Sequence, residues 1–154
     1  MTKPIIKPTV LEDIEGLVAV LDGTGLFPGA LLPDMLAPYL EKQTDALWLT
    51  CHVENEAVGF CYVVPEALAD GTWNMLALAV RPDLQGKTLG SALVRAAEKT
   101  LQEDGRRLLV VDTSGTDEFS QTRKFYTQNG YVEEARIRDF WASGDDKVIF
   151  RKAL

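Results

Sequence analysis

The segment 76–103 constrains this chain more than any other, because an apolar run passes through a glycine-containing turn into an amphipathic pattern. The run 76–80, LALAV, has the composition of a buried strand and breaks at Arg81-Pro82. From Leu89 onward, apolar residues recur at the spacing of one helix face. The first N–H groups of such a helix have no partner inside it, and the helix dipole adds positive charge there. The sequence therefore predicts an anion site at this turn, best suited to phosphate.

Two interpretations compete for this turn. Gly86-Lys87-Thr88 matches the end of a P-loop, G-x-x-x-x-G-K-[ST], but the early glycine of that motif would fall at position 81, which is Arg81. That loop needs the early glycine so that the backbone can wrap the phosphates, and the P-loop interpretation fails for this reason. The dinucleotide fingerprint G-x-G-x-x-G does not match either. An ordinary strand–turn–helix connection without a ligand is the remaining alternative, and the loop alone does not decide between it and a phosphate site.

From Gln85 onward, the turn resembles the acyl-CoA loop of the GNAT family of N-acetyltransferases. That loop follows a strand ending near Val-x-Pro and has the pattern Gln/Arg-x-x-Gly-x-Gly/Ala, which Gln85, position 88 and Gly90 fit. Position 88, usually glycine, is Thr88 here. We expect its hydroxyl to donate a hydrogen bond to the pyrophosphate, because Gly86 and Gly90 leave the loop room to adjust. The resemblance implies acetyl-CoA as the acyl donor, with no metal. It assigns CoA contacts to Leu78, Ala79, Val80, Gln85, Gly86, Lys87, Thr88, Leu89, Gly90 and Ser91.

A second motif lies at 125–131, FYTQNGY, where the family typically has Phe-Tyr, three residues and then Gly-Phe or Gly-Tyr. In the family this tyrosine faces the CoA sulfur and acts as general acid, so the resemblance makes Tyr126 the catalytic residue. A phenol with a pKa near about 10 is protonated at neutral pH and can donate to a departing thiolate. The alternative role is that of a core aromatic, which we expect for Phe125.

The reaction implied by the resemblance is attack of a neutral primary amine on the acetyl carbonyl, which also needs a base and donors at the oxyanion. The resemblance supplies donors from the main chain of 78–80, but no base. The family often has a glutamate on that strand, where this chain has Asn74, a residue suited to ordering a water. His52, the single histidine, is a further candidate, as are Glu54 and Asp112. None of them is assigned.

The order of patterns along the chain predicts β-α-α-β-β-β-α-β-α-β-β, an α/β (α+β) fold. This order matches the GNAT fold, which implies one N-acetyltransferase domain over 1–154, with a central mixed, mostly antiparallel sheet of about seven strands flanked by about four helices. Thr9-x-x-Glu12 predicts a capping box for the first helix. Pro38 is expected to kink or split the second helix. A turn signal at 143–146 separates the last two strands.

The composition of the chain favours some classes of partner and cellular location over others. The formal charge of −7 argues against nucleic acid as a bulk partner and favours a cationic or amine substrate. No apolar run reaches the roughly 18 residues of a membrane span, and the first ten residues lack the apolar core of a secretory signal. Cys51 and Cys61 have no metal-ligand spacing and are expected to be buried thiols in neighbouring strands. A reducing cytoplasm is the expected location.

These observations predict a GNAT-like enzyme that transfers acetyl from acetyl-CoA to a primary amine of a small molecule. The resemblance also allows a homodimer through the last strands. A catalytically silent acyl-CoA-binding or sensor module with the same loop is the alternative from a different class. A nucleotide phosphohydrolase using Gly86-Lys87-Thr88 is a third hypothesis, and it predicts magnesium-dependent ATP binding.

Overall fold

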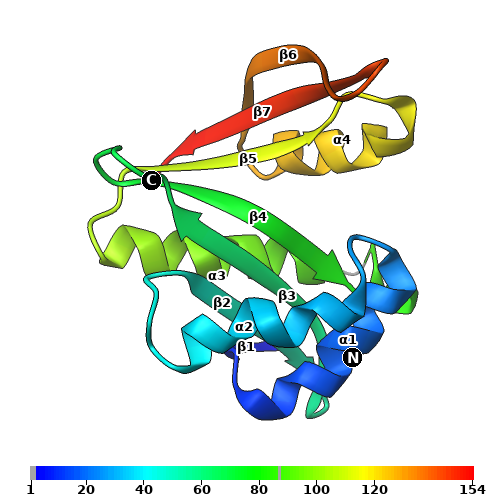
Figure 1. The fold of residues 1–154 in the computed structure, drawn as a ribbon, viewed down its shortest axis with the longest axis vertical. Helices are drawn as coiled ribbons and strands as arrows, with labels where there is room; N and C mark the ends of the chain where they lie inside the picture. Colours follow the sequence, from blue (N-terminus) through cyan, green and yellow to red (C-terminus); the bar gives the residue numbers. More distant parts are fainter. Residues whose placement is uncertain (1–2, 87) are drawn as a thin grey trace. The chain divides into compact units, whose positions relative to one another are not determined.

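The computed structural model describes residues 3–86 and 88–154 (Figure 1). Within these residues, seven strands form one mixed sheet in the order β1-β2-β3-β4-β5-β7-β6, accompanied by four α-helices. The elements follow one another along the chain in the predicted order, so the predicted fold class is confirmed. The strands are β1 (Ile5–Pro8), β2 (Leu47–Val53), β3 (Glu56–Pro65), β4 (Thr72–Val80), β5 (Leu108–Ser114), β6 (Val132–Ala142) and β7 (Asp145–Ala153). The helices are α1 (Ile14–Thr24), α2 (Leu32–Leu40), α3 (Leu89–Glu103) and α4 (Ser120–Gln128).

The chain divides into two compact units. The first comprises Met1–Val64 and Leu76–Thr100, and the second comprises Pro65–Met75 and Leu101–Leu154. Strand β4 belongs to both units, because its residues 72–75 lie in the second and 76–80 in the first. The predicted phosphate-binding turn therefore lies in the first unit, whereas Tyr126 lies in the second.

In the first unit, helices α1 and α2 cover one face of the sheet (Figure 1). Leu17 and Leu21 of α1 and Leu36 of α2 are fully buried against Trp48 and Phe60. The two aromatic rings stack with their centroids 5.8 Å apart. Burial of each such side chain contributes about 1.5–3 kcal/mol. This apolar layer fixes strands β2, β3 and the end of β4 beneath the two helices.

Helix α3 packs on the opposite face of the same strands, where Leu93 lies against Gly59 of β3. A Cβ at Gly59 would lie 2.9 Å from the carbonyl oxygen of Ala79, so the glycine permits β3 to approach β4 this closely. Cys51 and Cys61 are buried free thiols on β2 and β3, as predicted. Burial raises the pKa of the Cys61 thiol to about 12.

The second unit is built on strands β5, β6 and β7 and helix α4. A parallel ladder joins residues 72–75 of β4 to 108–111 of β5, and β7 lies antiparallel between β5 and β6. Leu109, Val111, Val148 and Phe150 of these strands are buried. Strand β6 forms one edge of the sheet, and all of its residues are exposed.

The predicted capping box at Thr9 and Glu12 is wrong. The Thr9 hydroxyl lies 2.8 Å from the Thr50 hydroxyl on β2. The backbone N–H of Thr9 donates to the carbonyl of Trp48, so Thr9 extends the pairing of β1 with β2. The side chain of Asp13 accepts the N–H of Val10 instead, at 3.0 Å. The tertiary pairing with β2 thus takes up the hydroxyl that local sequence assigned to the helix.

Two further expectations need correction. Pro38 does not split α2, because it lies in the last turn of a helix that ends at Leu40, where little remains to be broken. The final turn is shorter than the signal at 143–146, since Asp145 and Asp146 already belong to β7. Asp145 accepts a hydrogen bond from Ser114 at 2.5 Å, and Asp146 accepts the N–H of Asp139 at 3.0 Å.

Candidate active site

The turn between β4 and α3 is anchored to the end of the strand. The Nε2 amide of Gln85 donates to the carbonyl oxygen of Val80 at 3.0 Å. Gly86 has φ 78° and Thr88 has φ 66°, so both have left-handed backbones. The carbonyl of Thr88 accepts the N–H of Ala92 at 3.0 Å and so belongs to the first turn of α3. Lys87, the predicted cation of this loop, lies outside the described residues.

Thr88 keeps a backbone conformation that glycine adopts at little cost. A β-branched side chain in the left-handed region is strained by about 1–3 kcal/mol. The family usually has glycine at this position, and the backbone of Thr88 is in the region that glycine favours. Thr88 therefore combines a backbone conformation typical of glycine with an exposed side chain.

The main chain of 78–80 precedes this turn in β4. Ala79 is buried in the α1–α2 layer, whereas Leu78 is half-buried. Arg81 donates its N–H to the carbonyl of Val58 on β3 at 2.8 Å, which holds the end of β4 in place. The first unit thus fixes the strand end and the helix start that flank the turn.

The Arg81 side chain does not supply a free positive charge to the turn. Its Nε lies 2.7 Å from Asp83, and its Nη1 lies 3.1 Å from Glu56. The hydrogen bond to Asp83 is the main cause that raises the pKa of the guanidinium above its ordinary value. Two carboxylates therefore accompany this cation, and its charge is not available to the turn.

Tyr126 lies in the aromatic layer of the second unit. Its ring is 5.2 Å from Phe125, 5.7 Å from Tyr131 and 5.8 Å from Phe150, measured between centroids. The residue is 5% exposed. Phe125, which we expected in the core, is only half-buried. The ring of Tyr126 is therefore held by its aromatic neighbours.

Asn74 and Asp112, two candidates from the sequence, are in contact in the second unit. The Asn74 Nδ2 lies 3.3 Å from Oδ2 of Asp112 and 2.9 Å from Oε1 of Glu66. Lys147 lies 3.4 Å from the same Asp112 oxygen. The sequence analysis did not select Glu66, which is 8 positions from Asn74, or Lys147, which reaches Asp112 because β7 pairs with β5. Glu54, the other acidic candidate, is exposed in the turn between β2 and β3.

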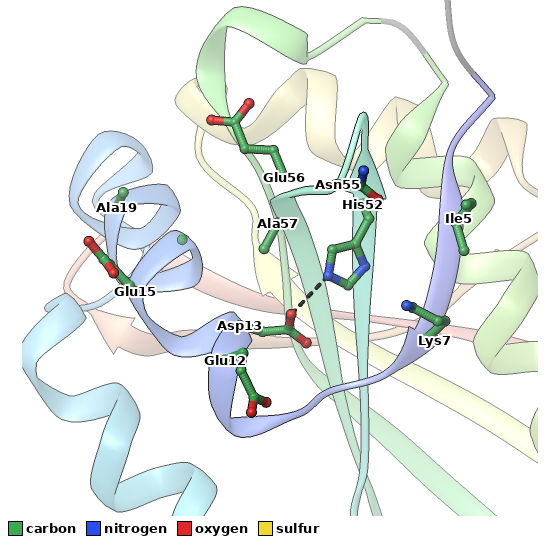
Figure 2. Close-up of a pocket in the computed structure, with 11 residues that line it drawn as sticks. Ile5, Lys7, Glu12, Asp13, Glu15, Ala19, His52, Asn55, Glu56 and Ala57 are labelled. Carbon is green, nitrogen blue, oxygen red and sulfur yellow. Dashed lines mark hydrogen bonds and ion pairs between the residues drawn. The ribbon is translucent and has the colours of Figure 1, made fainter.

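His52 lies at a separate cavity of about 560 Å³ in the first unit, between β1, the start of α1 and the β2–β3 turn (Figure 2). Its Nε2 lies 2.8 Å from Oδ1 of Asp13, a buried carboxylate. Figure 2 shows the ring between Asp13 and the side chain of Lys7. Asp13 holds the His52 ring in a half-buried position.

Comparison with protein families identifies the family to which this chain belongs. Residues 44–133, more than half of the chain, match the family described as Acetyltransferase (GNAT) domain. The chain belongs to the GNAT family of acetyltransferases. As a GNAT protein it is an acyltransferase, and the matched residues include β4, the turn, α3 and Tyr126.

Solved structures agree with this membership. A GNAT-family protein from Desulfovibrio desulfuricans is 25% identical, with a TM-score of 0.88 over 98% of this chain and 99% of that one. The ribosomal-protein-S18-alanine N-acetyltransferase of Escherichia coli has the same fold at 16% identity, with a TM-score of 0.78 over 98% and 94% of the two chains. An aminoglycoside 6′-N-acetyltransferase complexed with coenzyme A has a TM-score of 0.77 at 17% identity, over 97% and 96%. A search of curated proteins finds no match.

The described part of the GNAT chain has neither a membrane-spanning helix nor a metal-binding cluster. Over 3–86 and 88–154, no helix has both the length and the apolar character needed to cross a membrane. The same described residues contain no group of three or more histidine, cysteine, aspartate or glutamate side chains arranged to hold a metal ion.

Proposed function

We propose that this GNAT protein transfers acetyl from acetyl-CoA to a primary amine of a small molecule. The turn after β4 carries this proposal. There, Gln85 bonds to the carbonyl of Val80, and Gly86 and Thr88 have left-handed backbones. Helix α3 begins directly after them. A helix start preceded by such a turn directs main-chain N–H groups toward an anion and adds the field of the helix dipole.

The proposed donor site combines this turn with the strand before it. The amides of 86–91 bind the diphosphate of the carrier, and the Thr88 hydroxyl adds a donor. The main chain of 78–80 binds the pantetheine arm and the thioester oxygen, where negative charge develops during attack. Three observations support these roles: the fixed strand end, the exposed Gln85 and Gly86, and coenzyme A in the aminoglycoside 6′-N-acetyltransferase of the same fold.

In the proposed reaction, Tyr126 is the general acid. The lone pair of the neutral acceptor amine forms a C–N bond to the acetyl carbon. The C–S bond then breaks, and its electron pair goes to sulfur. The Tyr126 hydroxyl donates its proton to this thiolate, which leaves as free CoA. The N-protonated amide loses one proton to solvent, and the Tyr126 phenolate takes up one proton from solvent. Support for this role comes from the motif at 125–131 and from the aromatic neighbours that hold the ring.

A small-molecule amine is favoured as acceptor by the formal charge of −7, which attracts cations. An aminoglycoside 6′-N-acetyltransferase of the same fold bears a name consistent with that class. The ribosomal-protein-S18-alanine N-acetyltransferase, also of this fold, makes a protein N-terminus the competing class of acceptor.

Two measurements test the proposed function. Acetyl-CoA at about 100 times its Kd is expected to stabilise the folded protein by about 2.7 kcal/mol, whereas ATP with magnesium is expected to give no thermal shift. A panel of amines and of N-terminal peptides is then screened for thiol release from acetyl-CoA. Release with small amines supports the proposal. A shift without release from any acceptor supports the silent sensor module, and a shift with ATP–magnesium alone supports the phosphohydrolase.

A further inference from the structure

A buried amide in the second unit uses its two N–H groups on carboxylates and leaves its oxygen unused. Asn74 on β4 is 7% exposed. Its Nδ2 donates to Oε1 of Glu66 at 2.9 Å and to Oδ2 of Asp112 at 3.3 Å. Its Oδ1 is buried and has no hydrogen-bond partner among the described residues.

The two carboxylates fix which way this amide points. Rotating the Asn74 amide by half a turn would place Oδ1 against two carboxylate oxygens, where neither atom has a hydrogen to share. Oδ1 is therefore the acceptor that stays unpaired. A buried acceptor without a donor costs free energy that a bound N–H or O–H group recovers, and such an atom calls for an explanation.

The charges around this amide favour a cation. Glu66 and Asp112 carry two negative charges, and Lys147 carries one positive charge. The Lys147 ammonium lies 3.4 Å from Oδ2 of Asp112 and 4.3 Å from the centroid of Phe140. It therefore pairs with one carboxylate and an aromatic face, and it leaves Glu66 and the Asn74 oxygen without a cation of their own in this group. The group as a whole has a net negative charge.

We propose that Glu66, Asn74 and Asp112 bind the amine of the acetyl acceptor and select amines that carry no carboxylate beside the nitrogen. This inference rests on the proposed acetyl transfer. The amine binds in its ammonium form: an N–H donates to Oδ1 of Asn74, and the two carboxylates stabilise the positive charge. One proton then passes to solvent, and the neutral amine attacks the thioester. An α-amino acid brings its own carboxylate toward the carboxylates of Glu66 and Asp112, and these negative charges repel one another. The acceptor class is therefore a cationic amine rather than a free amino acid.

Binding is tested first, without turnover. The 15N side-chain amide resonance of Asn74, assigned by its loss in Asn74→Ser, is followed during titration with n-butylammonium or with tetramethylammonium. Both probes carry one positive charge, but only n-butylammonium has N–H donors. A saturable shift with n-butylammonium alone supports the site. Equal shifts with both probes, or no shift with either, refute the ammonium site, and water is then the remaining partner for Oδ1 of Asn74.

Selectivity is then tested with pairs of acceptors that differ by one carboxylate beside the reacting amine, namely agmatine against arginine and tyramine against tyrosine. We expect the KM of each decarboxylated amine to be lower by about tenfold or more. Glu66→Gln and Asp112→Asn are expected to remove most of this difference through KM. Glu118→Gln, an exposed carboxylate of the same unit, serves as the matched control. Circular dichroism and the unfolding midpoint confirm that each variant folds.

The outcomes separate this inference from the function on which it rests. If acetyl-CoA binds and small amines are acetylated, but each amino acid matches its decarboxylated partner, the selectivity is refuted and the function stands. If neither acetyl-CoA binding nor thiol release occurs, the proposed function fails, and the amide titration by itself then decides whether the ammonium site exists.

Discussion

Nε2 of His52 lies 2.8 Å from Oδ1 of Asp13, a residue 39 positions earlier in the chain. The other oxygen of Asp13 accepts the N–H of Val10 at 3.0 Å. One buried carboxylate therefore joins the segment before α1 to strand β2. Asp13 and His52 both line the cavity in Figure 2.

Removal of this carboxylate is expected to destabilise the first unit. Asp13→Ala leaves the Val10 N–H and the His52 ring without their acceptor, and an unpaired buried polar group costs about 1–3 kcal/mol. We expect the free energy of unfolding in urea to fall by about 2 kcal/mol. The exposed neighbour Glu12 supplies the control, since Glu12→Ala should change stability by no more than about 0.5 kcal/mol. Equal effects of the two substitutions would contradict a structural role for the Asp13–His52 pair.

The buried thiol of Cys61 is expected to make stability depend on alkaline pH. Burial raises its pKa from the ordinary value of 9.0 to about 12 in the folded protein. A raised folded pKa gives stability that is fully present below pH 9.0 and is lost as pH rises toward about 12. Over this window the slope from one such group approaches about 1.4 kcal/mol per pH unit.

The pH dependence is measured by urea unfolding of the wild type and of Cys61→Ala between neutral pH and the alkaline limit of reversible folding. Cys61→Ala is expected to be less stable at neutral pH, because it loses buried volume, but to lose stability less steeply above pH 9.0. Parallel curves for the two proteins would show that Cys61 does not titrate as its burial implies.

Thr88 offers a matched pair of substitutions in the proposed donor site. Thr88→Val keeps a β-branched side chain at a left-handed position and removes only the hydroxyl, whereas Thr88→Ser keeps the hydroxyl. If the hydroxyl donates to the pyrophosphate, Thr88→Val should weaken acetyl-CoA binding by about 1–1.5 kcal/mol, roughly tenfold in Kd. Thr88→Ser should bind nearly as the wild type does. Calorimetry measures both, and equal Kd values for the two variants would exclude the hydroxyl as a donor.

Tyr126→Phe is expected to separate chemistry from binding. Loss of a general acid lowers kcat by about 100-fold or more, while the aromatic packing against Tyr131 and Phe150 is retained. The Kd for acetyl-CoA should stay within about twofold. Tyr131→Phe removes a hydroxyl from the neighbouring buried ring and is the control, with a small expected change in kcat. A normal kcat in Tyr126→Phe would leave the ring with only a packing role.

Local sequence was most reliable where neighbouring residues decide the structure. Strand β4 contains the predicted run 76–80 and ends at Val80, before Arg81-Pro82, and α3 begins at Leu89 after the predicted turn. Both follow from signals read within a few residues: an apolar run, a proline and glycine, and a repeating apolar face. The prediction of Cys51 and Cys61 as buried thiols held for the same reason, since each lies in an apolar strand.

Predictions failed where a distant partner took up a local group. The Thr9 hydroxyl contacts Thr50, 41 residues away, rather than capping a helix. The sequence pointed to Asn74 and Asp112 separately, but it gave no reason to add Glu66 or Lys147 to them. Asn74, Asp112 and Lys147 come together because β4, β5 and β7 lie side by side in the sheet. Glu66 is held beside β4 by its N–H, which donates to the carbonyl of Thr72.

The sequence by itself therefore determined the order of elements, the family and the turn that we assign to the acyl donor, because periodicity and turn chemistry act between residues close in the chain. Only the tertiary structure decided which carboxylates contact Asn74, which side chain holds His52, and that Glu56 pairs with Arg81. Contacts between strands, loops and the segment before α1 bring most of these groups within hydrogen-bond distance, and no pattern in the linear chain records which segments will meet.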